Sequence, residues 1–278
     1  MNNEIFFEVI LKLREELRFL SCIDHEVPMQ IDIPDESDKF PAVLMIHGFM
    51  SSRNNDNHML ARISKKIVEA GIVAARIDLC SMGENLYSRE NYGMKVMTDE
   101  VKASFKYLQS LPYVEENNVG LLGHSLGGRL VFTCSTLPAK IIVSLNGAIN
   151  TSEPLEMAYD KFQMDNLGYC IVHTSSGGVE LVYRRFFDEL KTTLNDNIKN
   201  FKNPILVEVC ISDPTLDPNI SLNFIKNCHM DNVDSFTVEN ANHTYNVETG
   251  DFTKLNEVIG KVVPWISSHI KLKNQSFV

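Results

Sequence analysis

Residues 118–135 read NVGLLGHSLGGRLVFTCS, and this stretch decides the fold. The run VGLLG is typical of a buried strand, and LGGRLVFTC after it is typical of a helix. Between them, Gly123-His124-Ser125-Leu126-Gly127 fits the pattern G-x-S-x-G. Glycines two residues either side of a serine suit a turn so tight that a Cβ would collide across it. The stretch therefore predicts a sharp strand-to-helix turn that holds the Ser125 hydroxyl clear of the backbone. A glycine-lined turn with an idle serine is the alternative.

The flanking segments repeat this alternation of strand and helix. The sequence predicts strands at 41–47, 72–79, 140–148, 204–211 and 235–239, and helices at 58–70, 96–108, 221–228 and 252–270. Pro264 is expected to kink or interrupt the last helix. Residues 19–33 hold two further apolar runs, which predict an antiparallel hairpin. Strands separated by helices of about 10–15 residues are typical of an α/β fold, with a mostly parallel central sheet flanked by helices.

The regular alternation stops at about residue 150 and resumes at about 203. The interval holds YCIVHT and VELVYRRFF around a Gly-Gly turn, which predicts a β-hairpin, and then a helical region. We therefore expect a core of residues 1–150 and 204–278, with a small cap, 151–203, inserted after the sixth strand.

The N-terminal residues 1–18 are predicted to form an additional amphipathic helix. The apolar side chains of this segment fall roughly on one helical face. Packing against the core is the simplest role for such a helix, and contact with a membrane surface or a second copy is the alternative.

Composition excludes some classes of protein. The 278 residues carry 36 acidic and 26 basic side chains, a formal charge of −10, which argues against a duplex-binding protein. No apolar run approaches the ~20 residues of a membrane span. The six cysteines are widely spaced, with no CxxC pair, and the N-terminus does not read as a secretory signal. We expect reduced thiols in a cytoplasmic protein, and no metal site.

A serine hydroxyl needs a base within hydrogen-bonding distance to become a nucleophile. Among eight histidines, His243 follows the strand SFTVE and precedes the last helix. That position lies at the carboxyl edge of the sheet, where Ser125 must also lie. His243 is therefore the predicted base. His124 is expected to point away from Ser125 and pack, and His47 to support its own loop.

An acid must orient the base and stabilise its protonated form. Asp213 and Asp217 both follow the strand PILVEVCI. Asp213 lies just beyond the strand, and the proline after it stiffens the loop. Asp217 lies further along, where it can cap the next helix. Asp213 is favoured, with Asp217 as the alternative.

When a serine attacks a carbonyl group, the tetrahedral intermediate carries a negatively charged oxygen, which backbone amides can stabilise. Gly48 follows the strand AVLMI and lets the chain turn, so that the amides of Phe49 and Leu126 are predicted to form the oxyanion hole. Alternatively, Gly48 only ends the strand.

Four motifs in this order, HGF, GHSLGG, SDP and ANH, resemble those of the α/β-hydrolases from about residue 19 onward. The cap with its hairpin resembles that of the cinnamoyl or feruloyl esterase group of bacterial carboxylesterases, in which the hairpin closes over an aromatic acyl group. The sequence departs from related hydrolases after RIDL, where it keeps Asp78 and Gly83 but loses a glycine and a serine of D-x-x-G-x-G-x-S. The cap also contains no tryptophan.

The resemblance implies a serine esterase that works through an acyl-enzyme without a metal or organic cofactor. Its predicted partner is a small-molecule ester, with no nucleic acid. A peptidase, thioesterase or lysophospholipase of the same fold is the alternative within enzymes, and a catalytically silent binding protein is the alternative outside them. Assembly into a homo-oligomer is left open.

Overall fold

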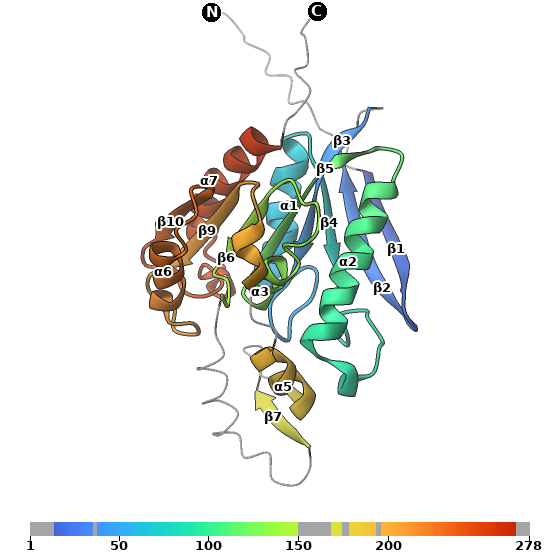
Figure 1. Ribbon diagram of the computed structural model, residues 1–278, viewed down its shortest axis with the longest axis vertical. Helices are drawn as coiled ribbons and strands as arrows, with labels where there is room; N and C mark the ends of the chain where they lie inside the picture. The colour runs from blue at the N-terminus through green and yellow to red at the C-terminus, as the bar shows by residue number, and fades with distance from the viewer. Residues whose placement is uncertain (1–13, 36–37, 150–167, 174–177, 193–195, 271–278) are drawn as a thin grey trace, which may run out of the picture.

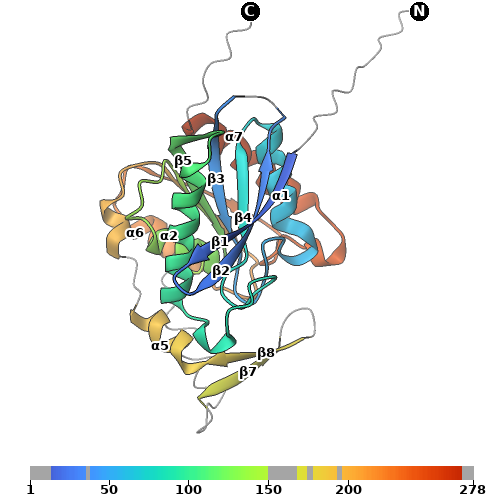
Figure 2. The same ribbon diagram turned by 90° about the vertical axis from the view of Figure 1, so that its right-hand side faces the viewer.

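The computed structural model describes residues 14–35, 38–149, 168–173, 178–192 and 196–270. A mostly parallel sheet lies at the centre, and helices cover both of its faces (Figures 1 and 2). In the described residues its strands are β1 (Arg14–Cys22), β2 (His25–Ile33), β3 (Phe40–Ile46), β4 (Val73–Ile77), β5 (Val114–His124), β6 (Ile142–Leu145), β9 (Ile205–Cys210) and β10 (Val233–Val238). They are ordered β1-β2-β4-β3-β5-β6-β9-β10. The predicted α/β architecture is confirmed.

Along the sheet from β4 through β3, β5, β6 and β9 to β10 the strands are parallel, and only β2 is reversed, antiparallel to both of its neighbours, β1 and β4. β3 consists of seven fully buried residues, FPAVLMI, because both faces of the sheet are covered. On one face lie α2 (Met94–Ser110), α3 (Leu126–Thr133) and α6 (Pro218–Asn227), and on the other α1 (Met59–Glu69) and α7 (Thr253–His269). α7 continues through Pro264, so the interruption predicted there is not observed.

The predicted helix at residues 1–18 is wrong for its last five residues. Residues 14–18 belong to strand β1, which pairs along its whole length with β2. Backbone hydrogen bonds to β2 outweigh the helical pattern, whose residue Leu17 is 46% exposed on the strand. Residues 1–13 of the predicted helix lie outside the described residues.

A second, two-stranded sheet follows β6 in the chain. β7 (Tyr169–His173) and β8 (Val179–Tyr183) form the predicted hairpin, and α5 (Arg184–Thr192) and a 3₁₀ turn, η3 (Asp196–Asn200), follow it. Residues 184–187, expected to extend the second strand, instead begin α5. Figure 2 shows the hairpin and α5 beyond the end of the central sheet. The exact limits of the cap, 151–203, stay a prediction, because 150–167 lie outside the described residues.

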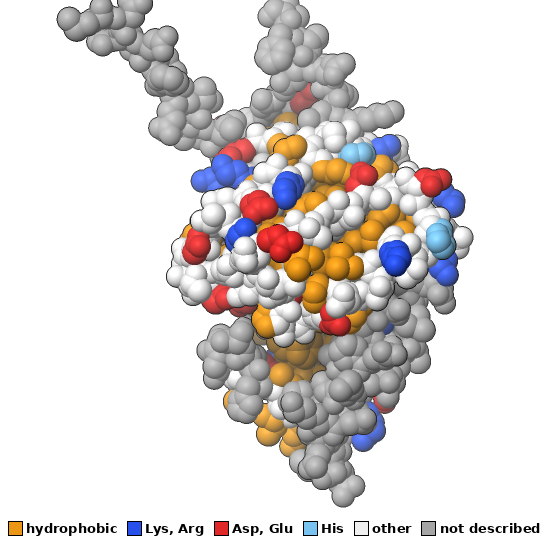
Figure 3. Space-filling view, turned by 90° about the vertical axis from the view of Figure 1, so that its left-hand side faces the viewer, with side chains coloured by type: hydrophobic (Ala, Val, Ile, Leu, Met, Phe, Trp, Pro, Cys, Tyr) orange, Lys and Arg blue, Asp and Glu red, His pale blue; other side chains and the backbone are white. Residues whose placement is uncertain are grey.

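The surface that carries α6, β10 and α7 is of mixed character. Figure 3 shows acidic and basic side chains interspersed with hydrophobic ones on this face. Within the described ranges, no helix is both long and apolar enough to span a bilayer.

The topology brings the carboxyl ends of the parallel strands to one edge of the sheet. Ser125 follows β5 there, the loop with Asp213 follows β9, and the loop with His243 follows β10. These residues, far apart in sequence, therefore meet at the edge where α/β sheets bind their ligands.

The start of α3 packs so closely on β3 that glycine is required there. A Cβ built on Gly127 would lie 2.2 Å from the carbonyl oxygen of Ile46, and backbone cannot move aside. We expect Gly127→Ala to cost more than about 3 kcal/mol of unfolding free energy, measured by denaturant titration. The control is Gly260→Ala on α7, where a Cβ meets nothing within 4 Å, and which should be neutral or stabilising by up to ~1 kcal/mol. Equal stability of the two variants would contradict the close approach.

Candidate active site

Ser125 occupies a strained turn between β5 and α3. Its backbone, at φ 55° and ψ −117°, lies in a region that L-residues rarely adopt. Hydrogen bonds hold the turn: the Ser125 amide donates to Leu145 (3.0 Å), and its carbonyl accepts from Ala148 (2.9 Å). A Cβ on Gly123 would lie 2.1 Å from the Gly127 carbonyl oxygen, so the glycines around the serine have the steric role expected of them.

The imidazole of His243 and the carboxylate of Asp213 lie in direct contact. Nδ1 of His243 is 2.6 Å from Oδ2 of Asp213, and the Asp213 side chain is only 3% exposed. Asp213 also accepts from the amides of Thr215 (2.7 Å) and Leu216 (3.1 Å). Burial by itself would raise the pKa of Asp213, but the bond from His243, the charge of that ring and the two amides together lower it. The carboxylate therefore stays ionised and fixes the proton of His243 on Nδ1.

Asp217 has a different role. It is the N-cap of α6, and its carboxylate accepts from the amide of Asn219 at 3.0 Å. Of the two candidate acids, the structure brings only Asp213 to His243.

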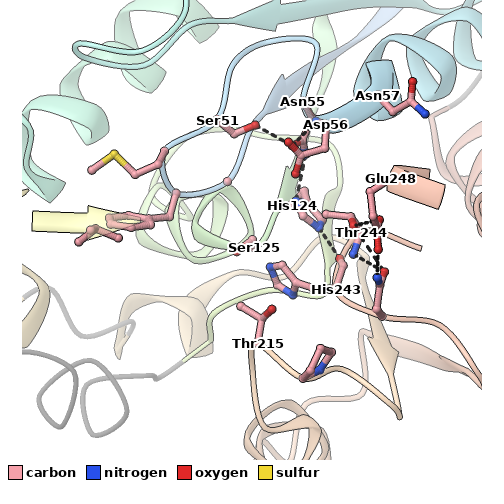
Figure 4. A pocket seen from close by; sticks show the side chains of 16 residues that line it. Ser51, Asn55, Asp56, Asn57, His124, Ser125, Thr215, His243, Thr244 and Glu248 are labelled. Atoms are coloured by element: carbon pink, nitrogen blue, oxygen red, sulfur yellow. Dashed lines mark hydrogen bonds between the residues drawn. The ribbon is translucent and has the colours of Figure 1, made fainter. Parts of the chain in front are cut away.

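Ser125 and His243 line one cavity of about 640 Å³ at this edge of the sheet (Figure 4). Because Asp213 takes Nδ1, the free ring nitrogen of His243 is Nε2. Within the described residues, the Ser125 hydroxyl makes no hydrogen bond to that ring. Such bonds are often long before substrate binds and tighten in the reacting complex.

The loop after β3 approaches the serine closely. A Cβ on Gly48 would lie 3.1 Å from Cβ and 3.5 Å from Oγ of Ser125. In the described part of the chain, the amides of Phe49 and Leu126 donate to no protein acceptor. Both are thus available to an oxygen bound beside Ser125.

His47 fixes the orientation of this loop. Its Nε2 accepts from the Leu79 amide (3.0 Å), so Nδ1 carries the proton and donates to the Gly48 carbonyl (2.8 Å). In a planar trans peptide, the carbonyl and the next amide point in opposite directions. Holding the Gly48 carbonyl therefore sets the direction of the Phe49 amide. Burial lowers the pKa of His47 and keeps the ring neutral, as this arrangement needs.

His124 contributes more than the packing expected of it. Asn55 donates to its Nδ1 (3.1 Å), so Nε2 carries the proton and donates to the backbone carbonyl of His243 (2.9 Å). Burial, followed by the charge of His243, lowers the pKa of His124 to about 3. His124 thus stays neutral and anchors the loop that carries His243.

A buried carboxylate on β9 was missed in the sequence. Glu208 is fully buried and accepts from the hydroxyl of Tyr245 (2.7 Å) and the amide of Asn146 (3.0 Å). Burial raises its pKa to about 7. The available signal was a single charged residue inside the apolar run PILVEVCI, on a strand of a sheet predicted to be flanked by helices.

The loop that departs from the D-x-x-G-x-G-x-S pattern is still held by Asp78. This carboxylate accepts from the amides of Arg53 (2.7 Å) and Glu84 (3.0 Å) and pairs with the Arg53 guanidinium. Gly83 is required beside it, because a Cβ there would collide with the Asp78 carboxylate.

The cavity has an apolar and a polar end. Phe49, Met50 and Val172 line it on the side of the cap, with Val172 contributed by β7. The phenyl ring of Phe49 packs on Phe186 of α5 at 5.3 Å between ring centres, so the cap supports this end. Asp56, Asn57 and Glu248 line the other end (Figure 4). The described residues contain no group of three or more His, Cys, Asp or Glu placed to hold a metal ion.

Comparisons with known proteins agree with this geometry. The model of the Dienelactone hydrolase family matches residues 29–162, and that of the BAAT / Acyl-CoA thioester hydrolase C-terminal family matches residues 102–230. Both matches include the Ser125 turn. The chain has the α/β-hydrolase fold.

Solved structures share this fold at low sequence identity. Est1E from Butyrivibrio proteoclasticus, solved with ferulic acid, superposes with a TM-score of 0.72 at 18% identity, over 91% of this chain and 99% of Est1E. The alpha/beta hydrolase GrgF from Penicillium sp. sh18 gives a TM-score of 0.71 at 14% identity, over 93% and 99% of the two chains.

A curated relative is an uncharacterized 31.7 kDa protein of Escherichia coli, encoded in the traX-finO intergenic region. It is 23% identical over 126 residues, which are 44% of this chain and 43% of that protein. The match spans less than half of the relative's length.

Replacement of the two aspartates of the β9–α6 loop should have opposite effects on catalysis. Asp213→Asn should lower kcat by a factor of roughly 10³ or more, because the variant no longer holds the proton on Nδ1 of His243. Asp217→Asn should change kcat less than about threefold, because asparagine also caps helices. Steady-state hydrolysis of an aryl ester measures both, and the reverse ranking would assign the acid to Asp217.

Gly48 allows a second test of the site. Gly48→Ala places a methyl group against Ser125, and we expect it to displace the Phe49 amide and lower kcat by about tenfold or more. Circular dichroism confirms folding, and Gly260→Ala is the matched control. Unchanged turnover in a folded Gly48→Ala protein would refute the placement of this loop.

Proposed function

We propose that this chain is a serine hydrolase that cleaves carboxylic esters with Ser125 as nucleophile, His243 as base and Asp213 as the orienting acid. The observation that carries the proposal is the shared position of the strained serine and the His243–Asp213 pair at one cavity. Such a constellation is the requirement for nucleophilic catalysis by serine.

The reaction consists of two acyl transfers. Nε2 of His243 takes the proton of Ser125 as Oγ attacks the ester carbonyl carbon, and the amides of Phe49 and Leu126 stabilise the resulting oxyanion. The tetrahedral intermediate collapses, the bond to the alcohol oxygen breaks, and the alcohol leaves with the proton from His243. Water then repeats the sequence on the acyl-enzyme, releases the acid and restores Ser125. Asp213 stabilises the imidazolium in both halves.

For the acyl group we propose a cinnamoyl or feruloyl type. Support comes from the apolar end of the cavity, where Phe49, Met50 and Val172 suit a flat aromatic acid. The hairpin of the cap contributes Val172. Est1E, which has a similar fold, was solved with ferulic acid bound. The compartment proposed is the cytoplasm, which the six free cysteines suit.

Thioester hydrolysis is a second candidate. It is favoured by the match of residues 102–230 to a family of acyl-CoA thioester hydrolases. The same nucleophile, base and oxyanion hole serve an ester and a thioester equally, because the chemistry at the carbonyl carbon is the same.

The nucleophile is tested by Ser125→Ala. We expect the purified variant to lose ester turnover by a factor of about 10⁴ or more, with its unfolding temperature within a few degrees of the wild type. A fluorophosphonate probe should label wild-type protein at Ser125 and leave the variant unlabelled. Retained turnover in the variant, or folded wild-type protein that does not react, would refute the proposal.

The acyl and leaving groups are tested with matched substrates. Hydrolysis rates of methyl ferulate, methyl butyrate and butyryl-CoA separate an aromatic esterase, an aliphatic esterase and a thioesterase. We expect kcat/KM for the ferulate ester to exceed that for the butyrate ester by at least about tenfold. A preference for the thioester would favour the second candidate.

A further inference from the structure

Two side chains that take no part in the reaction itself bind the backbone of the loop that presents His243. The backbone carbonyl of His243 accepts two hydrogen bonds, one from His124 (2.9 Å) and one from the side-chain amide of Asn146 (3.1 Å). Asp213 fixes the ring of His243, whereas these two bonds fix its backbone.

Asn146 is itself held by β9. The side-chain oxygen of Asn146 accepts from the backbone amide of Cys210 (2.7 Å). The backbone amide of Asn146 donates to the carboxylate of Glu208 (3.0 Å). The backbone of Asn146 has a positive φ of 42°, which costs energy in any residue but glycine. The hydrogen bonds to β9 hold it in this conformation.

Glu208 also grips the loop of the base directly. The hydroxyl of Tyr245, two residues after His243, donates to the same carboxylate oxygen, Oε2, at 2.7 Å. Tyr245 is fully buried and has a positive φ of 58°. One buried oxygen thus joins Asn146, which binds the carbonyl of His243, to Tyr245, which lies two residues further along the same loop.

Burying a carboxylate in a sheet is costly, and apolar packing would serve stability better. Its neighbours on the same side of β9, Leu206 and Cys210, belong to the apolar core against α1 and α7. We propose that Glu208 is a positioning residue for the catalytic base, which holds the backbone of His243 in place through Asn146 and Tyr245. The inference rests on the proposed function.

The ionised form of Glu208 should be the effective one, because hydrogen bonds to a charged acceptor are about twice as strong as those to a neutral one. The titratable groups that face Glu208 are Tyr245 and Cys210, which donate to it, and Asp213, whose charge opposes its ionisation. Burial, the largest effect, places the pKa of Glu208 at about 7. The hydrogen bonds from Asn146 and Tyr245 to Glu208, which hold the loop of His243, should therefore weaken as the pH falls through neutrality.

Glu208→Gln is the decisive variant. The bonds from Asn146 and Tyr245 both go to Oε2, so a glutamine oxygen in that place preserves them, and the variant removes the charge and the long contact from Cys210 Sγ to Oε1 (3.5 Å). At pH 8.5 we expect kcat/KM for an aryl ester to fall about tenfold. The ratio of wild type to variant should decline toward about 1 below pH 6, where Glu208 is protonated and also neutral.

Stability should change in the opposite sense from activity. The pKa of Glu208 is raised on folding, so its ionisation disfavours the folded state as the pH rises. The glutamine variant should then unfold at the same temperature as the wild type at pH 8.5, or at a higher one. Lower activity without lower stability separates positioning of His243 from a general loss of structure.

Two further variants complete the experiment. Tyr245→Phe removes one hydrogen bond that lowers the pKa of Glu208. It should therefore move the inflection near pH 7 in the pH profile of kcat/KM to higher pH. Glu100→Gln is the matched control: Glu100 is equally buried but lies on α2, hydrogen-bonded to His25 at 2.8 Å. Its ratio to wild type should not vary with pH.

The outcomes are distinct. A wild-type to Glu208→Gln ratio that is constant with pH, while Ser125→Ala is inactive, overturns the role of Glu208 and leaves the proposed function intact. Turnover that survives Ser125→Ala overturns the proposed function and this inference with it. The rate of fluorophosphonate labelling at Ser125 should reproduce the same pH-dependent ratio without any ester substrate.

Discussion

The close approach of α3 to the ends of β3 and β6 is the constraint on which the site depends. Gly127 lies against the backbone of Ile46, and Gly128 against Gly147, at distances that admit no side chain. With α3 drawn in this far, Ser125 is forced into its strained conformation and comes within contact of the Gly48 loop. The proposed nucleophile and the proposed oxyanion amides are therefore placed by one backbone packing arrangement.

Strain at this edge of the sheet is balanced by buried hydrogen bonds. Ser125, Asn146 and Tyr245 all have positive φ values, each at a cost of order 1–3 kcal/mol. Glu208 binds two of these three residues, and Leu145 and Ala148 hold the third. Polar groups inside a core are costly unless satisfied, so such a network specifies a single arrangement. Here the specified arrangement is the one that brings the proposed base, His243, and the proposed nucleophile, Ser125, to the same cavity.

The sequence was sufficient wherever a local pattern determined the outcome. The G-x-S-x-G turn, the strand-helix alternation and the position of Asp213 directly after its strand all predicted the observed structure. The N-terminal segment failed because its apolar spacing suits a helix, while pairing with a strand that follows it in the chain made residues 14–18 extended. Tertiary contacts of this kind are not visible in a periodicity.

The supporting residues of the site show the same limit more sharply. His124 was expected only to pack. Its contact with the His243 carbonyl joins segments 119 positions apart in the chain, so no local pattern predicts it. Glu208 stood out as a charge in an apolar strand, but only the fold shows that its partners are Asn146 and Tyr245. Reacting groups are recognisable by residue type and by their place at strand ends. The groups that hold them are recognisable only once the strands are assembled, because any polar side chain of suitable reach can do that work.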